Sequence, residues 1–277
     1  MNDELAILFA KRFIQRRDVK AVQFASGAYV PDRELKNRQT QEPDPGRFGP
    51  LGFQMKHLHQ HLQASASYGH YLLDNDSHCR LFAFDIDLEK EGFWSPLEVT
   101  AEPEAFPVNP REAWQDRAHP GRPWMKMQMG MLARKFVSAI QGELGIPCAA
   151  AYSGGKGIHV YGFTGPLPAM QVRAAATFVI ESMDDWELFK GQHFYRHKLR
   201  DPMLGYPNFS VEVFPKQDNL DGKDLGNLMR LPLGRNLKSA DPTFFLDLTT
   251  PIGVMAPHPN PVQLLENGNP YEDSTSQ

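Results

Sequence analysis

Residues 80–89, RLFAFDIDLE, alternate between two kinds of side chain, and this alternation constrains the fold more than any other feature of the chain. Phe82 and Phe84 point to one side of a strand, whereas Asp85 and Asp87 point to the other. The segment therefore predicts a strand with one apolar face. Its second face changes from apolar to acidic toward the end of the strand.

Helices and strands follow this segment in a regular order. Apolar periodicity predicts helices over 124–144 and 169–183, and we expect strands over 148–152, 158–163 and 209–214. Together with the acidic strand they give β-α-β-β-α-β, the ferredoxin-like or RRM-like arrangement of an α/β (α+β) protein. In that sheet the first strand lies between the third and the fourth. We therefore expect the acidic strand to neighbour both of the later strands.

The chain divides into three parts on this interpretation. Residues 1–79, with a helix over 4–17, are expected to form an N-terminal α/β module. Residues 80–250 form the core, and 251–277 read as a loose C-terminal tail. Within the core, residues 89–123 are rich in proline and show no periodicity, so we expect a loop insertion there.

Composition excludes several classes of protein. No apolar run approaches the length of about 20 residues that a membrane span needs, and the acidic N-terminus does not resemble a secretion signal. Cys79 and Cys148 are too few for a disulfide framework or a cysteine-rich zinc site. The net charge of −4 argues against a protein that coats nucleic acid through bulk positive charge. We expect a cytoplasmic protein without membrane contact or structural zinc.

Asp85 and Asp87 are the first candidate site residues. They are two apart on a strand, so both carboxylates point the same way, roughly 6–7 Å apart. Two carboxylates on one face repel each other unless a cation neutralises them, and oxygen ligands suit Mg²⁺ or Mn²⁺. Glu212 alternates away from Val211 and Val213 and could complete a two-metal site for phosphoryl transfer. The alternative is a solvated strand end.

The turn SGGKG, residues 153–157, joins two predicted strands and holds the second set of candidates. Glycines such as Gly155 allow backbone N–H groups to point into an anion-binding concavity. Lys156 adds a positive charge, Ser153 a hydroxyl and His159 a ring at the start of the next strand. The turn predicts a triphosphate cradle, although it lacks the spacing of a Walker A loop. The alternative is a glycine-rich hairpin in which His159 caps a backbone carbonyl.

Three stretches together carry a resemblance to a known family. FDID, SGGKGIHVY and VEVFPKQDNLDGKDLGNLMRLPLG resemble the acidic pair, the Ser-x-His element and the third acidic strand of the archaeo-eukaryotic primase superfamily. The chain is most similar to bacterial, phage and plasmid primase-polymerases. SGGKGIHVY is also similar to the polymerase domain of bacterial end-joining DNA ligases. The resemblance covers about residues 5–240, including RFIQRRDVKAVQ and HLQASASYGHYLL in the N-terminal module.

The resemblance implies a primase-polymerase fold and assigns roles to residues. The residues implied to hold two divalent metal ions are Asp85, Asp87 and Glu212. The residues implied to contact the triphosphate of an incoming NTP or dNTP are Ser153, Gly155, Lys156, His159, Gln217 and Arg230. Arg230 lies in an apolar strand, so a structural ion pair is the competing interpretation.

Two departures from the family pattern stand out. The third acidic residue is Glu212 rather than the more frequent aspartate, and both residue types bind hard cations. The chain also lacks the cysteine and histidine set that supplies a zinc element in some members.

The resemblance implies a DNA primase-polymerase that acts in phage or plasmid replication, in a bacterial or phage-infected cell. Its expected partners are a single-stranded DNA template, a primer and nucleoside triphosphates, with a replicative helicase as a further candidate. One alternative is a repair or end-joining polymerase that extends a primer but does not start one. The other is a non-catalytic replication initiator that binds nucleotide and DNA. Three acidic residues on neighbouring strands argue against a pure binding module.

Two basic clusters are candidates for holding a template through phosphate contacts and stacking. They consist of Arg12, Arg16, Arg17 and Lys20, and of Arg196, Lys198 and Arg200. Solvated surfaces are the alternative interpretation for both.

Overall fold

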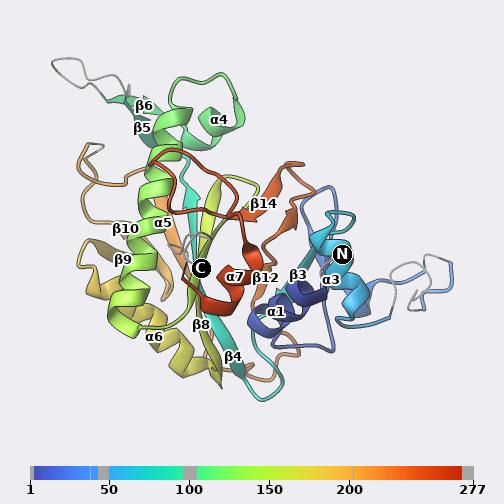
Figure 1. The fold of residues 1–277 in the computed structure, drawn as a ribbon. Helices are drawn as coiled ribbons and strands as arrows, with labels where there is room; N and C mark the ends of the chain where they lie inside the picture. The colour runs from blue at the N-terminus through green and yellow to red at the C-terminus, as the bar shows by residue number, and fades with distance from the viewer. Residues whose placement is uncertain (1–2, 38, 43–49, 96–104, 202, 270–277) are drawn as a thin grey trace.

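The computed structural model describes most of the chain and contains an eight-stranded and a four-stranded β-sheet flanked by helices, with a separate two-stranded sheet (Figure 1). The described residues are 3–37, 39–42, 50–95, 105–201 and 203–269. None of the helices among them is both long enough and apolar enough to cross a bilayer.

The larger sheet has eight strands, and each strand is antiparallel to its neighbours. In order across the sheet these are β13 (Gly234–Arg235), β14 (Pro242–Phe245), β7 (Cys148–Tyr152), β8 (Gly157–Pro168), β4 (His78–Leu88), β11 (Phe209–Phe214), β10 (Phe194–His197) and β9 (Trp186–Lys190). The middle of this sheet, β7-β8-β4-β11, is the ferredoxin-like arrangement. The expected fold class and the position of the acidic strand β4 between β8 and β11 are confirmed. A hairpin of β9 and β10, which the sequence pattern did not predict, extends the sheet beyond β11.

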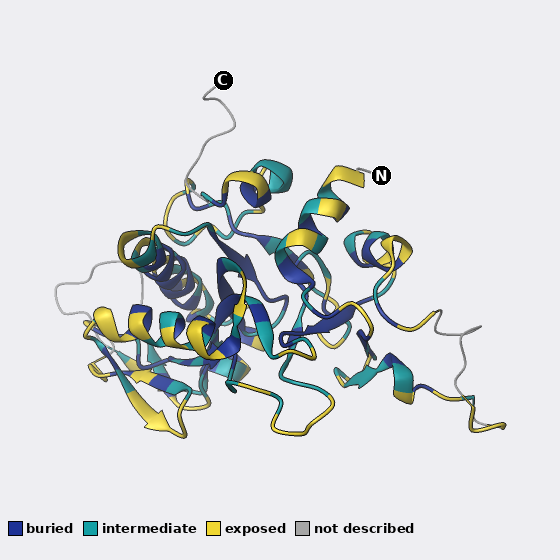
Figure 2. Ribbon diagram, turned by 90° about the horizontal axis from the view of Figure 1, so that it is seen from below, coloured by how far each residue is buried: buried dark blue, intermediate teal, exposed yellow. Residues whose placement is uncertain are grey.

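Helices α5 (Arg122–Leu144) and α6 (Ala169–Ser182) cover one face of this sheet (Figure 1). The apolar side of β4 packs there, with the ring of Phe84 centred 4.8 Å from that of Phe136 on α5. Figure 2 shows both helices with buried residues toward the sheet and exposed residues outward. Burial of this face leaves the acidic side of β4 facing away from the helices.

The smaller sheet has the order β12 (Leu228–Arg230), β3 (Tyr68–Tyr71), β1 (Ala21–Gln23) and β2 (Tyr29–Pro31). The helices in the same N-terminal part of the chain are α1 (Asp3–Phe13), α3 (Met55–Leu62) and the short 3-10 helix η1 (Asp32–Glu34). Strand β12 therefore joins the N-terminal sheet although it comes from the segment assigned to the core. Phe13 of α1 contacts Tyr161 of β8, with ring centroids 5.1 Å apart, so the two sheets share one core.

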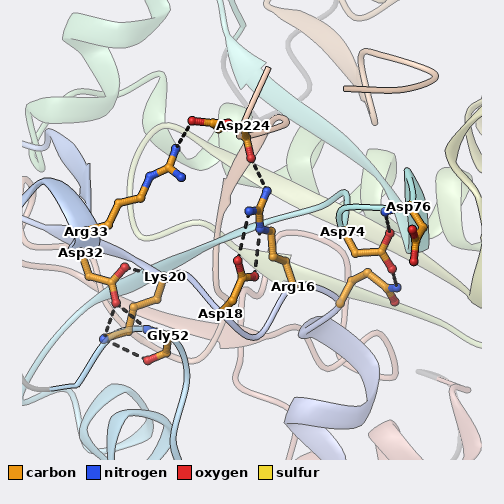
Figure 3. Close-up of polar contacts among 10 residues, drawn as sticks. Arg16, Asp18, Lys20, Asp32, Arg33, Gly52, Asp74, Asp76 and Asp224 are labelled. Carbon is orange, nitrogen blue, oxygen red and sulfur yellow. Dashed lines mark hydrogen bonds and ion pairs between the residues drawn. The ribbon is translucent and has the colours of Figure 1, made fainter. Parts of the chain in front are cut away.

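Polar contacts within the N-terminal module occupy part of the first basic cluster (Figure 3). The ammonium of Lys20 is fully buried and lies 2.9 Å from Oδ2 of Asp32. Arg16 is also buried; its Nε donates to Oδ1 of Asp18 and its Nη1 to the carbonyl of Asp224. These two side chains hold loops together and do not form an exposed surface for a template.

The insertion after β4 is partly regular in structure. It forms the strand pair β5 (Gly92–Trp94) and β6 (Phe106–Val108), followed by helix α4 (Pro110–Gln115). Asn109 caps α4 by accepting hydrogen bonds from the amides of Arg111 and Glu112. Residues 96–104 of this segment lie outside the described residues.

The C-terminal segment contains helix α7 (Pro261–Asn267), which packs beside α1 (Figure 1). Leu264 and Leu265 are buried, and Nε of Arg12 donates to the carbonyl of Leu265 at 2.7 Å. This helix is docked on the N-terminal module, whereas the sequence suggested a loose tail. The rest of the expected tail, from 270, lies outside the described residues.

Candidate active site

Three strands bring His159, Asp85 and Glu212 into one row. Asp85 on β4 is the direct cross-strand partner of His159 on β8 and of Glu212 on β11. Directly paired residues of antiparallel strands project from the same face, so the three side chains meet on the sheet face opposite α5 and α6. Asp87 lies two residues further along, at the end of β4.

The turn between β7 and β8 requires glycine at two positions. Gly154 has φ +68°, and a Cβ there would lie 2.7 Å from Cγ2 of Thr243. A Cβ on Gly157 would lie 2.1 Å from the carbonyl oxygen of Ile86. The glycines therefore let the turn approach both β4 and β14.

Ser153 closes this turn from within. Its amide and its Oγ both donate to the carbonyl of Gly157, at 3.1 Å and 2.9 Å. The carbonyl of Gly155 accepts from Nε1 of Trp114 at 2.6 Å and from the hydroxyl of Tyr152 at 3.0 Å. Contacts within the turn itself, from β7 and from α4 therefore hold the turn in place.

Each of the three carboxylates lies next to a basic side chain. Nε2 of His159 lies 3.4 Å from Oδ1 of Asp85. Lys156 forms an ion pair with Oδ2 of Asp87, and Lys216 forms one with Oε1 of Glu212. The acidic row is thus balanced by cations from the glycine-rich turn and from the segment after β11.

The two aspartates differ in their electrostatics. Removal from water raises the pKa of Asp85, but the neighbouring His159, Lys156 and Arg230 together outweigh this effect and lower it below its ordinary value. Removal from water, and then the neighbouring charge of Asp85, raise the pKa of Asp87 to about 6, against the opposing effect of Lys156. The pair therefore has excess negative charge even beside Lys156.

The donor set suits a divalent cation. Oδ1 of Asp85 and Oε1 of Glu212 are buried, and neither accepts a well-aligned hydrogen bond. Carboxylate oxygens at the edge of a pocket are the ligands that Mg²⁺ and Mn²⁺ use, and here their neighbours are the basic side chains of His159 and Lys216. Within the described ranges, however, no three His, Cys, Asp or Glu side chains are already gathered so as to hold a metal ion, so ion binding would require these carboxylates to rearrange.

A pocket of about 510 Å³ opens beside the turn. It contains the predicted residues Asp85, Asp87, Ser153, Gly155, Lys156, His159 and Arg230. Nε of Arg230 donates to the hydroxyl of Tyr29 at 3.0 Å, and its Nη1 donates to the carbonyl of Ser153. Among the described residues Arg230 forms no ion pair with a carboxylate; its guanidinium lines the pocket and is held there by Tyr29 and Ser153.

Much of the pocket wall comes from residues that sequence reasoning missed. Trp114, Arg117 and Arg122 come from α4, the turn that follows it and the start of α5, inside the segment expected to be a loop insertion. The guanidinium of Arg122 lies over the ring of Trp114, 4.5 Å from its centroid. Periodicity could not indicate these residues, because the proline-rich stretch shows none. The frequency of Trp and Arg in this stretch was the feature of the sequence that could have indicated them.

The loop after β13 forms the opposite wall, with Asn236, Lys238 and Ser239. Nδ2 of Asn236 donates to the carbonyl of Gly154 at 3.0 Å, while its Oδ1 accepts from Nε2 of Gln23 at 3.1 Å. Strand β1 of the N-terminal sheet thus supports the glycine-rich turn through this loop.

A second pocket of about 330 Å³ lies on the Glu212 side of the aspartates. Asp85, Asp87 and Lys156 line both pockets and separate them. The other residues of the second pocket are Glu89, Arg111, Phe189, Lys190, Phe194, Ser210 and Glu212. Its rim therefore combines two aromatic rings from the β9–β10 hairpin with basic side chains.

Gln217 lies away from both pockets. It follows β11 at the end that pairs with Ala83, whereas the pockets open near Asp87 at the other end of β4. Its exposed Nε2 donates to the carbonyl of Asn219 at 2.9 Å. The structure thus places this residue apart from the other nucleotide candidates.

One comparison with known proteins gives a match. The family model described as "TOTE conflict system, Archaeo-Eukaryotic Primase domain" matches residues 4–273. The match covers both sheets and reaches α7. A comparison with curated proteins finds no match.

Proposed function

This chain belongs to the archaeo-eukaryotic primase domain family of TOTE conflict systems, and on that premise we propose that it joins nucleotides on a nucleic-acid template. The reaction is attack of a 3′-hydroxyl on the α-phosphate of an NTP or dNTP, with release of pyrophosphate. One observation carries the proposal. Two pockets, one basic and one part aromatic, meet at the carboxylates of Asp85 and Asp87.

The larger pocket suits the incoming nucleotide. Lys156, Arg230 and Lys238 line it and carry positive charges that a triphosphate would neutralise. Backbone amides of the glycine-rich turn and the ring of His159 add hydrogen-bond donors. Its basic lining supports the assignment of this pocket to the triphosphate.

The smaller pocket suits the attacking end of a primer or of a first nucleotide. In phosphoryl transfer the attacking and leaving oxygens lie roughly in line, on opposite sides of the phosphorus. If pyrophosphate leaves toward Lys156 and Arg230, the hydroxyl must approach from the Glu212 side. Phe189 and Phe194 offer faces for base stacking there, and Lys190 offers a contact for a backbone phosphate.

Asp85, Asp87 and Glu212 are the residues that would hold Mg²⁺ or Mn²⁺. The raised pKa of Asp87 and the buried carboxylate oxygens of Asp85 and Glu212, which lie beside basic side chains, fit that role. Bound there, two such ions would lower the pKa of the attacking hydroxyl and stabilise the charge that develops on the phosphate.

The setting follows the family description. We propose action in a conflict system and not in phage or plasmid replication beside a helicase. Template and primer remain the proposed partners, with the β9–β10 hairpin as the contact surface. That hairpin carries Arg196, which also belongs to the second basic cluster.

The test is incorporation of labelled nucleotides. The full chain is incubated with Mg²⁺ or Mn²⁺ and either NTPs or dNTPs, on unprimed single-stranded DNA and on a primed template. Product on both templates indicates a primase-polymerase, and product on the primed template alone indicates an extending polymerase. The double variant Asp85→Asn with Asp87→Asn is the control for contaminating polymerase. Absence of product on both templates, with nucleotide still bound, would instead support a binding module.

A further inference from the structure

The hydroxyl of Tyr161 lies behind the active site, within hydrogen-bond distance of the ring of His159. Tyr161 is on β8, two residues after His159, and projects from the same face. The residue is fully buried, and its ring meets those of Phe13 and Phe163. A buried phenol hydroxyl must find a partner within the protein, and this one lies 2.8 Å from Nδ1 of His159.

The direction of this hydrogen bond follows from its surroundings. Burial raises the pKa of Tyr161 well above its ordinary value, so the hydroxyl keeps its proton. On the other side of the imidazole, Nε2 lies 3.4 Å from Oδ1 of Asp85, and an ionised carboxylate can only accept. A neutral ring satisfies both neighbours in one way. Nδ1 accepts from Tyr161, and Nε2 carries the proton toward Asp85.

We propose that Tyr161 is a positioning residue that fixes the proton of His159 on Nε2, where it faces Asp85 and the nucleotide pocket. The effect of Tyr161 on catalysis rests on the proposed function, whereas the position of the proton on His159 does not depend on that function. With the proton on Nε2, the ring can donate to Asp85 or to a phosphate oxygen of a bound nucleotide. With the proton on Nδ1, the lone pair of Nε2 would face those negative oxygens and repel them.

The contact also connects the N-terminal module to the site. The ring of Phe13 on α1 packs edge-on against Tyr161, with centroids 5.1 Å apart. Packing against α1 of the N-terminal module therefore holds Tyr161, while the hydroxyl of Tyr161 orients His159, a pocket residue of the core. The same ring of Phe13 touches Phe163, which fixes this part of β8 further.

The first experiment reads the tautomer directly and needs no substrate. The full chain is labelled with ¹⁵N-histidine and studied by NMR at alkaline pH, where an imidazole is neutral. The His159 signals among the ten histidines are assigned by comparison with His159→Gln. We expect the Nε2–H form in the wild type and a shift toward a mixture of both forms in Tyr161→Phe. An Nδ1–H form in the wild type overturns the proposal, and so does an unchanged spectrum in the variant.

The second experiment measures nucleotide incorporation by Tyr161→Phe. Removing one hydrogen bond from the ring should lower kcat/KM about tenfold. Tyr68→Phe is the matched control, because its hydroxyl donates to Oε1 of Gln60 at 2.8 Å and lines neither pocket. An equal loss in both variants would mean a general effect on the fold and overturn the positioning role. If the wild type incorporates no nucleotide, the proposed function fails while the NMR result still decides the tautomer.

Discussion

Lys156 and Asp87 form an ion pair between the two pockets of the site. The lysine belongs to the glycine-rich turn, and the carboxylate ends the acidic strand β4. The same ammonium is our proposed contact for a triphosphate, and the same carboxylate is a proposed metal ligand. The two roles compete, because Lys156 cannot neutralise Asp87 and a phosphate equally well at one time.

Lys156→Met should therefore change metal and nucleotide affinity in opposite directions. Without nucleotide, Mn²⁺ binding should tighten about threefold, since the pair is partly exposed and its energy modest. Nucleotide binding should weaken about tenfold through loss of a charged contact. Titration of free Mn²⁺ by electron paramagnetic resonance and equilibrium nucleotide binding measure the two effects. Lys198→Met, which removes an exposed partner of Asp184, is the control. Weaker Mn²⁺ binding in Lys156→Met would contradict the competition.

Asp87→Asn should lose activity without losing stability. The loss of a metal ligand should lower kcat by about 10²–10³. Because the pKa of Asp87 is raised to about 6, the folded state disfavours its charge at neutral pH, and the amide removes that cost. Primer extension and thermal unfolding at about pH 7.5 measure the two effects. Asp3→Asn, at an exposed carboxylate beside His59 of α3, should leave activity unchanged. Full activity of Asp87→Asn would rule out its role as a ligand.

Arg230→Lys should raise the KM for nucleotide about five- to tenfold. Its guanidinium donates at once to Tyr29 and to the carbonyl of Ser153, and a single ammonium cannot reach both positions. Initial rates over a range of nucleotide concentrations give the KM. Arg235→Lys serves as control because Arg235 is exposed and bonds to the carbonyl of Ala240. An unchanged KM would show that Arg230 is structural only.

Trp114→Phe should weaken nucleotide binding by about fivefold. The change removes the hydrogen bond from Nε1 to the carbonyl of Gly155, which loosens the glycine-rich turn, while an aromatic ring remains. Trp94→Phe is the comparison, since Trp94 stacks on Phe106 and lines neither pocket. If both variants bind nucleotide like the wild type, the insertion has no part in holding the turn.

Folding stability should fall as the pH drops below about 6.5. Burial lowers the pKa of His61 to about 4 and that of His70 to about 3. The unfolded chain therefore binds protons at these rings that the folded chain does not, at a cost of about 1.4 kcal/mol per pH unit for each ring. The raised pKa of Asp87 acts in the opposite direction, because its contribution to stability falls as the pH rises toward about 6.

Asp87 has the same effect in the wild type and in His70→Leu. Its contribution therefore cancels when the pH dependence of the free energy of unfolding is compared between the two proteins. Urea unfolding at several pH values between about 5 and 7.5 should show a shallower pH dependence in the variant, by about one proton. Parallel curves for the two proteins would mean that His70 is protonated in the folded state.

Features that depend on local periodicity and backbone freedom follow from the amino-acid sequence alone. The alternation around Phe84 and Asp85 specifies a strand with one apolar face, and the glycines after Ser153 specify a tight turn. The order of helices and strands then places β4 between β8 and β11. For that reason Glu212 could be expected beside Asp85 although 127 positions separate them, as the residue numbers give (212 − 85).

The side chains from distant segments that complete the site could not be read from the sequence, because tertiary packing brings them together. Trp114 comes from a stretch without periodicity, and Arg230 reaches the pocket because β12 pairs with β3 in the other sheet. Gln217, close to Glu212 in sequence, leaves the sheet at its far end. Strand and helix patterns fix which face a residue takes on its own element. The packing of one element on another, set by burial of shared apolar surface, fixes what that face meets.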